Sequence, residues 1–568
     1  MNPNHINFVQ NCIKQGNNGD DEDEQNEHFT VLLNGQKDLE DQLEEFKKAC
    51  DVHNKHQRKS KRRRYYSLAL MAEMVNCTTK DEVKRLLKNN TRTFLVDVVK
   101  NKPQEVEALV GLVKEAMNEQ QLEDPNVLLT VGIALQITGD ACRMGRNRNN
   151  CSLFLGKCNT ITLTCNPAYR YSGFKEIAYV INLDYHLPSI QLDDVISIGQ
   201  EVKGVVIKKL KTCIAVCIQE AGIVNSYDYI EIPNQCKSLQ SQTLIDIFTK
   251  DLEMAIRIQA DFIAVPRIRC LKFLKALRHR ITNDHNFMLI GNIDLEYVSR
   301  KMLDLLGLIQ QLDFLWLTNL FSNSQTEYLY LLQDVIPLAK CSKVPIIGSV
   351  PLEDCSDFKS FENHEFLWKI DCMFIVKSAW CNKYPLVVKK LLPIKNYRLA
   401  VTDNTMAIRD ILSSMQSIIN FIIRTISSIE CRAIFIYSKC KTAATALARV
   451  EIYCPVFVIL PLESMDASEL DDEMKYRIKL CKTLNLRRNL RPLLYTKEMN
   501  ECEYKPIDYG IEYVRRCGCL ETGDFVITLE VAKENGDDNV QLGVGEDVVI
   551  MRAFYVAPPK LGEKLKCN

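Results

Sequence analysis

The 568-residue sequence predicts an α/β protein: a TIM-type (β/α)8 barrel, a small β-barrel domain inserted in it, and a C-terminal doubly wound α/β domain. Three observations predict this class. Eight short apolar runs recur in the first 403 residues, stretches of helical apolar spacing separate most of them, and strand-like alternation follows the third run. The runs are Leu68–Met74, Phe94–Val99, Leu129–Ala134, Phe262–Val265, Phe287–Ile290, Phe314–Leu317, Val344–Ile347 and Cys372–Ile375.

Residues 1–64 differ in composition from the rest and are expected to form a charged, disordered extension. An acidic run, Asp20–Glu24, precedes a charged stretch of helical character, Lys37–Cys50, and a basic cluster, Arg58–Arg64. Such a cluster can be a nuclear address or a polyanion contact. The interpretation that we favour is a solvated tail that pairs with its own acidic half, because the basic run stands alone.

The barrel is expected in two parts, residues 65–139 with three strand-plus-helix units and residues 238–403 with five more. Helical spacing is clearest at Asp81–Leu87 and Pro103–Ala116, and proline is favoured in the first turn of a helix. Residues 140–237 instead show short alternating strands, as expected for the inserted β domain. They are Thr160–Leu163, Ile177–Leu183, Glu201–Lys208 and Thr212–Ile218.

Residues 404–568 are expected to form the C-terminal domain, because strands and helices alternate along them. Such alternation predicts a parallel, doubly wound sheet, here with an antiparallel edge. The expected elements are a helix from Met406, strand Ala433–Tyr437, helix Thr442–Val450, strands Val456–Leu460 and Leu493–Tyr495, helix Pro506–Cys517, and strands Phe525–Leu529 and Asp547–Phe554.

Net charge, apolar stretches and cysteine content indicate which partners and which cellular location to expect. Lys plus Arg equals Asp plus Glu, at 72 each, so no net charge attracts nucleic acid or an anionic membrane. No apolar stretch reaches the roughly 20 residues of a membrane span, and the first residues lack the apolar core of a secretory signal. The 23 cysteines include no paired CxxC sites. We therefore expect a cytoplasmic protein with reduced thiols, no membrane or nucleic-acid partner and no structural zinc.

Five fragments, in the order in which that family has them, give the chain a resemblance to pyruvate kinase. They are Leu135–Gly145 (Leu-Gln-Ile-Thr-Gly-Asp-Ala-Cys-Arg-Met-Gly), Leu183–Tyr185, Asp371–Pro385 with its Tyr-Pro end, Thr522–Ile527 and Met551–Val556. The domain order, with an insertion after the third barrel strand, is similar too. The resemblance implies a glycolytic phosphotransferase that moves a phosphoryl group from phosphoenolpyruvate to ADP, uses Mg²⁺ and K⁺, and forms tetramers.

The residues that this chemistry needs are largely replaced, however. Asn292 stands where the family has the lysine that faces the phosphoryl group, and Asp294 stands in place of a metal-binding glutamate. Phe321 replaces the metal-binding aspartate, and an aromatic ring is no ligand for a hard cation. The resemblance thus implies no complete metal site, with Asp294 as a remnant of one.

The substrate and potassium positions have changed in the same way. The family's substrate arginine is Leu95, and two potassium ligands are Asp97 and Val99. An aspartate ligand is Gln136, whereas Arg143 is retained. The proton-transfer threonine corresponds to Val350, and the motif at the eighth strand corresponds to Val376–Ala379. Candidate catalytic remnants are therefore Arg143, Asn292 and Asp294.

These replacements favour a catalytically impaired pseudoenzyme that acts by binding, or by homo- or hetero-oligomeric assembly with pyruvate kinase subunits. The alternative is an active or weakly active pyruvate kinase with a rebuilt site, in which Lys377 or Lys100 lends a charge. A barrel enzyme with a new reaction is a third hypothesis, for which no motif appears. No cofactor is expected, and Mg²⁺ and K⁺ are expected only if the family activity persists.

A possible effector site is less altered. In the resembling family a hydroxyl-rich turn between a strand and a helix binds a phosphorylated sugar. Ser438, Lys439, Lys441 and Thr442 lie at the corresponding junction. Helix N-termini attract anions, so these residues are candidates for binding a phosphorylated small molecule. The alternative is simple helix capping by Ser438 or Thr442 with exposed lysines.

Overall fold

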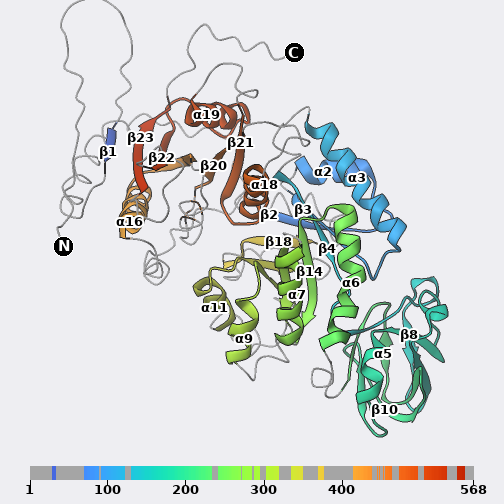
Figure 1. Ribbon diagram of the computed structural model, residues 1–568. Helices are drawn as coiled ribbons and strands as arrows, with labels where there is room; N and C mark the ends of the chain where they lie inside the picture. Colours follow the sequence, from blue (N-terminus) through green and yellow to red (C-terminus); the bar gives the residue numbers. More distant parts are fainter. Residues whose placement is uncertain are drawn as a thin grey trace, which may run out of the picture.

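The structure is a computed structural model. The residues that it describes are 29–32, 69–88, 91–121, 130–232, 241–269, 271–284, 287–293, 302–318, 334–349, 369–375, 413–437, 444, 447, 452, 454–462, 472–496, 505–533 and 547–556. Their strands form two closed barrels and a six-stranded sheet, beside one small two-stranded sheet (Figure 1).

Eight parallel strands close into a barrel in the order β14-β15-β16-β17-β18-β2-β3-β4. This confirms the eight strands predicted from the apolar runs. Their bounds are β2 Ala69–Met74, β3 Thr91–Asp97, β4 Gly132–Gln136, β14 Phe262–Ile268, β15 Met288–Ile293, β16 Phe314–Leu317, β17 Ile346–Ser349 and β18 Cys372–Ile375. The described helices of this part are α2 Lys80–Lys88, α3 Pro103–Gln121, α6 Ser241–Ile258, α7 Leu271–Asp284, α9 Met302–Ile309 and α11 Ile336–Cys341.

The barrel strands are nearly continuous in apolar residues because both of their faces are buried. In β3, Leu95 packs in the barrel interior with Phe262 and Phe314. Its neighbours Phe94 and Val96 belong to the second core, which also contains residues of the outer helices. Side chains on the two faces of this strand therefore pack in two different cores, so the strand does not show alternating polar residues.

Three aspartates join neighbouring strands at the amino-terminal end of the barrel. Asp261, Asp313 and Asp371 each lie directly before a strand. Each accepts a 2.8 Å hydrogen bond through Oδ2 from a backbone N–H at the start of the adjacent strand. The amides belong to Ile133, Leu289 and Ile346. Carboxylates that accept from backbone N–H groups make stronger bonds than neutral acceptors, so these residues hold the strand register.

We expect Asp313→Ala to destabilise the barrel by about 1–3 kcal/mol, because it leaves a buried amide without its acceptor. Asp313 also receives two hydrogen bonds from Arg278, at 2.6 and 3.2 Å. Urea unfolding would measure the loss. Asp313→Asn keeps an acceptor for the Leu289 amide and should lose less. Equal stability of Asp313→Ala and the parent would show that the contact contributes nothing.

The inserted domain is a second closed barrel, with strand order β10-β11-β7-β8-β5-β13-β9. The strands are β5 Cys142–Met144, β7 Thr160–Thr164, β8 Ile177–Ile181, β9 Val195–Ile198, β10 Val202–Lys209, β11 Cys213–Glu220 and β13 Tyr229–Glu231, beside a small sheet of β6 Leu153–Leu155 and β12 Gly222–Val224. The predicted strand Ile177–Leu183 is wrong at its end. Asn182 is left-handed (φ 64°), and a short helix, α5 Leu183–His186, follows it. The Asn182 amide holds this turn by donating to the carbonyls of Gly139 and Ala141, at 3.0 and 3.1 Å.

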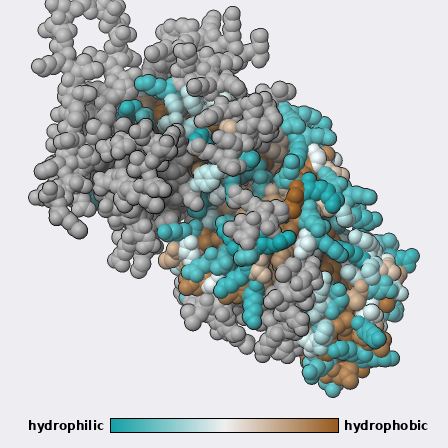
Figure 2. Space-filling view, viewed as in Figure 1, coloured by the Kyte–Doolittle hydropathy of each residue, from teal (hydrophilic) through white to brown (hydrophobic). Residues whose placement is uncertain are grey.

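Apolar side chains gather at the far tip of the inserted barrel, where Figure 2 shows a hydrophobic patch at the lower end of the molecule. A hollow of about 750 Å³ lies there, bordered by Leu192 and by residues 207–211. It lies away from the charged cluster described below. No helix in the described part of the chain is long and apolar enough to cross a membrane.

The third part is a six-stranded mixed sheet in the order β1-β23-β22-β19-β20-β21. The strands β19 Cys431–Tyr437, β20 Val456–Pro461, β21 Leu490–Tyr495 and β22 Phe525–Lys533 are parallel, and β23 Asp547–Tyr555 is antiparallel to β22. Buried residues of α16 Ser413–Ser428 and α18 Asp472–Asn485 lie in one core, and those of α19 Pro506–Arg516 lie in another. Alternate residues of β19 enter the two cores, so helices cover both faces.

One strand of this sheet comes from the N-terminal region. The strand β1, Phe29–Leu32, pairs antiparallel with β23 over Ile550–Ala553. The prediction of a wholly disordered extension is therefore wrong for these four residues. The acidic run Asp20–Glu24 and the basic cluster Arg58–Arg64 lie outside the described residues, as do most of the predicted helix Thr442–Val450 and the start of the helix predicted from Met406.

The end of α18 joins the sheet domain to the barrel. Leu486 is fully buried and packs with residues of the barrel interior, including Ala69 and Ile290. The Asn485 amide donates to the Thr130 carbonyl at 2.7 Å, and Lys482 Nζ pairs with Asp261 at 2.6 Å. The Arg488 N–H also donates to Asp371, at 3.4 Å. Asp261 and Asp371 therefore bind both the neighbouring barrel strand and the sheet domain.

Candidate functional site

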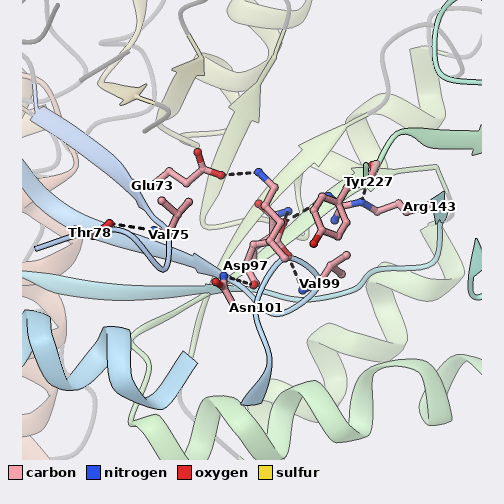
Figure 3. Close-up of polar contacts among 10 residues, drawn as sticks. Glu73, Val75, Thr78, Asp97, Val99, Asn101, Arg143 and Tyr227 are labelled. Carbon is pink, nitrogen blue, oxygen red and sulfur yellow. Dashed lines mark hydrogen bonds and ion pairs between the residues drawn. The ribbon is translucent and has the colours of Figure 1, made fainter. Parts of the chain in front are cut away.

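A cluster of charged residues lies where the carboxyl end of the barrel meets the inserted domain (Figure 3). Asp97, the last residue of β3, is at its centre and only 3% exposed. Its Oδ1 accepts from the Val99 backbone N–H at 2.8 Å, and its Oδ2 accepts from Gln136 Nε2 at 2.9 Å. Its backbone carbonyl accepts from the Asn101 amide at 2.9 Å. The carboxylate is thus held on both oxygens by neighbouring barrel residues.

Arg143 reaches Asp97 from the inserted domain. Its Nη2 lies 3.5 Å from Asp97 Oδ2, and its Nε donates to the Tyr227 carbonyl at 3.4 Å. The guanidinium also lies over the ring of Tyr229, at 5.1 Å. Burial opposes the charge, but Tyr229 and Asp97 outweigh it, so the pKa of Arg143 is raised. Among the described residues, no acceptor is found for the buried Nη1.

Lys100 forms a second ion pair at the same rim. Its Nζ lies 2.5 Å from Glu73 Oε1, at the carboxyl end of β2 (Figure 3). Burial alone would lower the pKa of Lys100. The carboxylates of Glu73 and Asp97 more than offset that effect, so the pKa is raised and the amine stays protonated. The charge is therefore paired within the protein.

Two arginines at the end of β14, a barrel strand, bind the inserted domain. Glu231 of β13 accepts hydrogen bonds from both Arg267 and Arg269, the latter at 2.8 Å. The Arg267 guanidinium also lies 4.8 Å from the Tyr229 ring centre, so Tyr229 has cations from both domains near it. A further cation–π contact, Lys102 with Tyr171 at 5.3 Å, joins the β3–α3 loop to the inserted domain. Together these contacts hold the two barrels against each other.

Asn292, near the end of β15, links three barrel strands. Its Nδ2 donates to the Trp316 carbonyl at 2.9 Å and to Thr318 Oγ1 at 3.2 Å. Its Oδ1 accepts from the Arg267 backbone N–H at 3.2 Å. Asn292 is 7% exposed, and its amide makes these three hydrogen bonds within the barrel. Asn292 therefore closes the rim between β14, β15 and β16.

The structure locates two of the predicted remnants. Arg143 and Asn292 both lie at the carboxyl end of the barrel, and Arg267 connects them through its backbone N–H and through Tyr229. Leu95 is buried in the barrel interior. The other candidates lie outside the described residues: Asp294, Phe321, Val350, residues 376–379, Ser438, Lys439, Lys441 and Thr442. Within the described residues no cluster of three or more His, Cys, Asp or Glu side chains could hold a metal ion.

The sequence reasoning missed the contribution of Glu231, Tyr229 and Tyr227. These residues sit at the end of the inserted domain, more than 80 residues from Arg143 along the chain. Nothing in their local pattern marks them as partners of the barrel. The one available signal was the Val265-Pro-Arg267 strand end, which places an arginine where barrel enzymes put functional groups.

A scan against protein-family models finds no match for this chain, and a search of curated proteins finds none either. The geometry of the cluster is therefore the main guide to function.

Proposed function

We propose that this chain is a divergent pyruvate-kinase-like protein that has lost phosphoryl transfer and acts by binding or by assembly with pyruvate kinase subunits. In this proposal the first barrel is of the TIM type and the C-terminal domain is a doubly wound regulatory domain. The observation that supports it most is that the charged groups at the described strand ends pair with groups of opposite charge. Four ion pairs join Asp97 to Arg143, Glu73 to Lys100, and Glu231 to both Arg267 and Arg269.

Phosphoryl transfer relies on positive charge placed in advance around the moving group. At the position where the resembling family has its lysine, Asn292 offers a neutral amide whose bonds hold the barrel rim. The loss of one such donor costs about 10²–10³ in rate. A missing metal carboxylate at Phe321 would add to that loss.

A weakly active kinase with a rebuilt site is the second candidate, and Lys100 is the observation in its favour. Its amine stays charged near the end of the barrel. It is paired with Glu73 at 2.5 Å, however, and a charge already neutralised stabilises a developing anion less. Mg²⁺ and K⁺ belong to this second candidate only.

Two further expectations, on cellular location and on an effector, belong to the proposal of an inactive, pyruvate-kinase-like protein. A cytoplasmic location and a phosphorylated effector at Ser438, Lys439, Lys441 and Thr442 are part of the proposal. Such an effector would act through the C-terminal domain, whose α18 end contacts the barrel at Asp261 and Thr130.

Pyruvate formation from phosphoenolpyruvate and ADP, with Mg²⁺ and K⁺, tests the proposal. We expect turnover at least about 10³-fold below that of an ordinary pyruvate kinase assayed in parallel. The matched variant is Asn292→Lys with Phe321→Asp, which restores two of the missing groups. Turnover within tenfold of the ordinary enzyme would overturn the loss of activity.

Assembly is tested separately, by native mass spectrometry of the chain alone and mixed with a pyruvate kinase. We expect oligomers of this chain or mixed oligomers. A monomer under both conditions would leave binding of a small ligand as the remaining mode of action and would exclude assembly.

A further inference from the structure

The turn that ends α19 brings two cysteines together. Helix α19 ends at Arg516, and Cys517, Gly518 and Cys519 follow it. The Gly518 N–H donates to the Arg515 carbonyl at 2.9 Å, and the Cys519 N–H donates to the Val514 carbonyl at 3.2 Å. With Gly518 left-handed at φ 70°, this is a Schellman helix end. Glycine is needed there because a side chain disfavours that conformation.

Both cysteines are thiols in the structure, and both are within reach of small reagents. Cys517 is exposed and Cys519 is half-buried. The Cys519 Sγ donates to the Cys517 carbonyl at 3.6 Å, so its sulfur already points back toward residue 517. Residues two apart have Cα atoms no more than about 7 Å apart, even when extended. A bent turn shortens that distance into the range of about 4.4–6.8 Å that a disulfide spans.

Three arginines adjoin the pair. Arg515 and Arg516 precede the pair, and Arg432 donates through Nε to the Cys519 carbonyl at 3.2 Å. The thiolate is the attacking species in thiol–disulfide exchange. Arg515 and Arg516 both pair with the carboxylate of Glu512, at 3.1 and 3.7 Å.

We propose that Cys517 and Cys519 form a redox-active dithiol that a low-molecular-weight disulfide, such as glutathione disulfide, oxidises reversibly. One thiolate attacks the small disulfide and releases one small thiol, which leaves a mixed disulfide on the protein. The second cysteine attacks that bond, forms the intrachain disulfide and releases the second small thiol. Two electrons pass from the protein to the small disulfide, and the two thiol protons leave with the products.

The small ring that this disulfide would close, with one residue between the two cysteines, decides how easily the bond is reduced. A disulfide across one intervening residue is strained, and strained, exposed disulfides are the labile and regulatory ones. We therefore expect the pair to stay reduced under reducing conditions and to oxidise only as the small-disulfide fraction rises. Redox-sensing pairs in reducing compartments behave in this way.

The test uses the full-length protein equilibrated with mixtures of oxidised and reduced glutathione, quenched with N-ethylmaleimide and digested for mass spectrometry. The expected product is a peptide that contains both cysteines, lacks two hydrogen atoms, carries no maleimide and returns to the labelled form after dithiothreitol. Cys517→Ser and Cys519→Ser should each trap a glutathione adduct on the remaining cysteine. Cys341→Ser removes an exposed cysteine elsewhere and should leave the oxidised fraction unchanged.

Two outcomes would overturn the proposal. One is full maleimide labelling of both cysteines across all glutathione mixtures. The other is a parent protein that accumulates only glutathione adducts, which would show that the second thiol cannot reach the mixed disulfide. Neither outcome depends on phosphoryl transfer, so the proposed function is tested independently.

Discussion

Arg143→Met should destabilise the protein by about 3 kcal/mol, because it removes the guanidinium that forms an ion pair with the buried Asp97 carboxylate. Removal of one partner of a buried ion pair costs about 3–5 kcal/mol, and the lower end applies here. The Val99 amide and Gln136 still donate to the remaining carboxylate. Urea unfolding of the parent and the variant, followed through the transition that includes the barrel, measures the difference.

The matched control removes the other charge. Asp97→Asn leaves Arg143 without its carboxylate partner, and the double variant Arg143→Met with Asp97→Asn has neither buried charge. We expect the double variant to be more stable than the sum of the single losses predicts, by about 0.5–3 kcal/mol of coupling. Strictly additive losses would show that the two side chains do not interact.

Leu486→Ala should cost about 2–5 kcal/mol, because a fully buried leucine is replaced by a cavity at the base of the barrel. The same change should loosen the sheet domain from the barrel, since Leu486 follows directly on the Asn485–Thr130 contact. Thermal unfolding gives the loss of stability, and limited proteolysis reports the loosening.

An exposed leucine provides the comparison for that experiment. Leu192 is 59% exposed at the tip of the inserted barrel, so Leu192→Ala should change stability by less than about 0.5 kcal/mol. If both leucine variants unfolded like the parent, the contact at the base of the barrel would contribute no stability.

The barrel strands could be predicted from the sequence because parallel strands buried on both faces leave continuous apolar runs. Four strands of the inserted domain, β7, β8, β10 and β11, were predicted for the related reason that buried residues alternate along them with more exposed ones. The end of β8 was missed because Asn182 turns the chain by binding Gly139 and Ala141, which lie more than 40 residues earlier. The strand β1 was missed because its pairing with β23 joins the two ends of the chain.

The candidate site was predictable only in part. Comparison with a family pattern drew attention to Arg143 and Asn292, since both stand at expected strand ends. It said nothing of what they touch. Asn292 turned out to hold the rim through Trp316 and Arg267, and Arg143 to pair with Asp97.

The sequence by itself determined the eight strands of the first barrel and their succession along the chain, because apolar periodicity is a local property that each segment carries alone. Through the resemblance it also led to the prediction that particular chemical groups are replaced at the strand ends. Only the tertiary structure decided which of the charged residues form ion pairs with one another. Asp97, Glu73 and Glu231 each pair with a cation. Those pairs join residues from separate strands and from two barrels, and such distances exist only after the chain has folded.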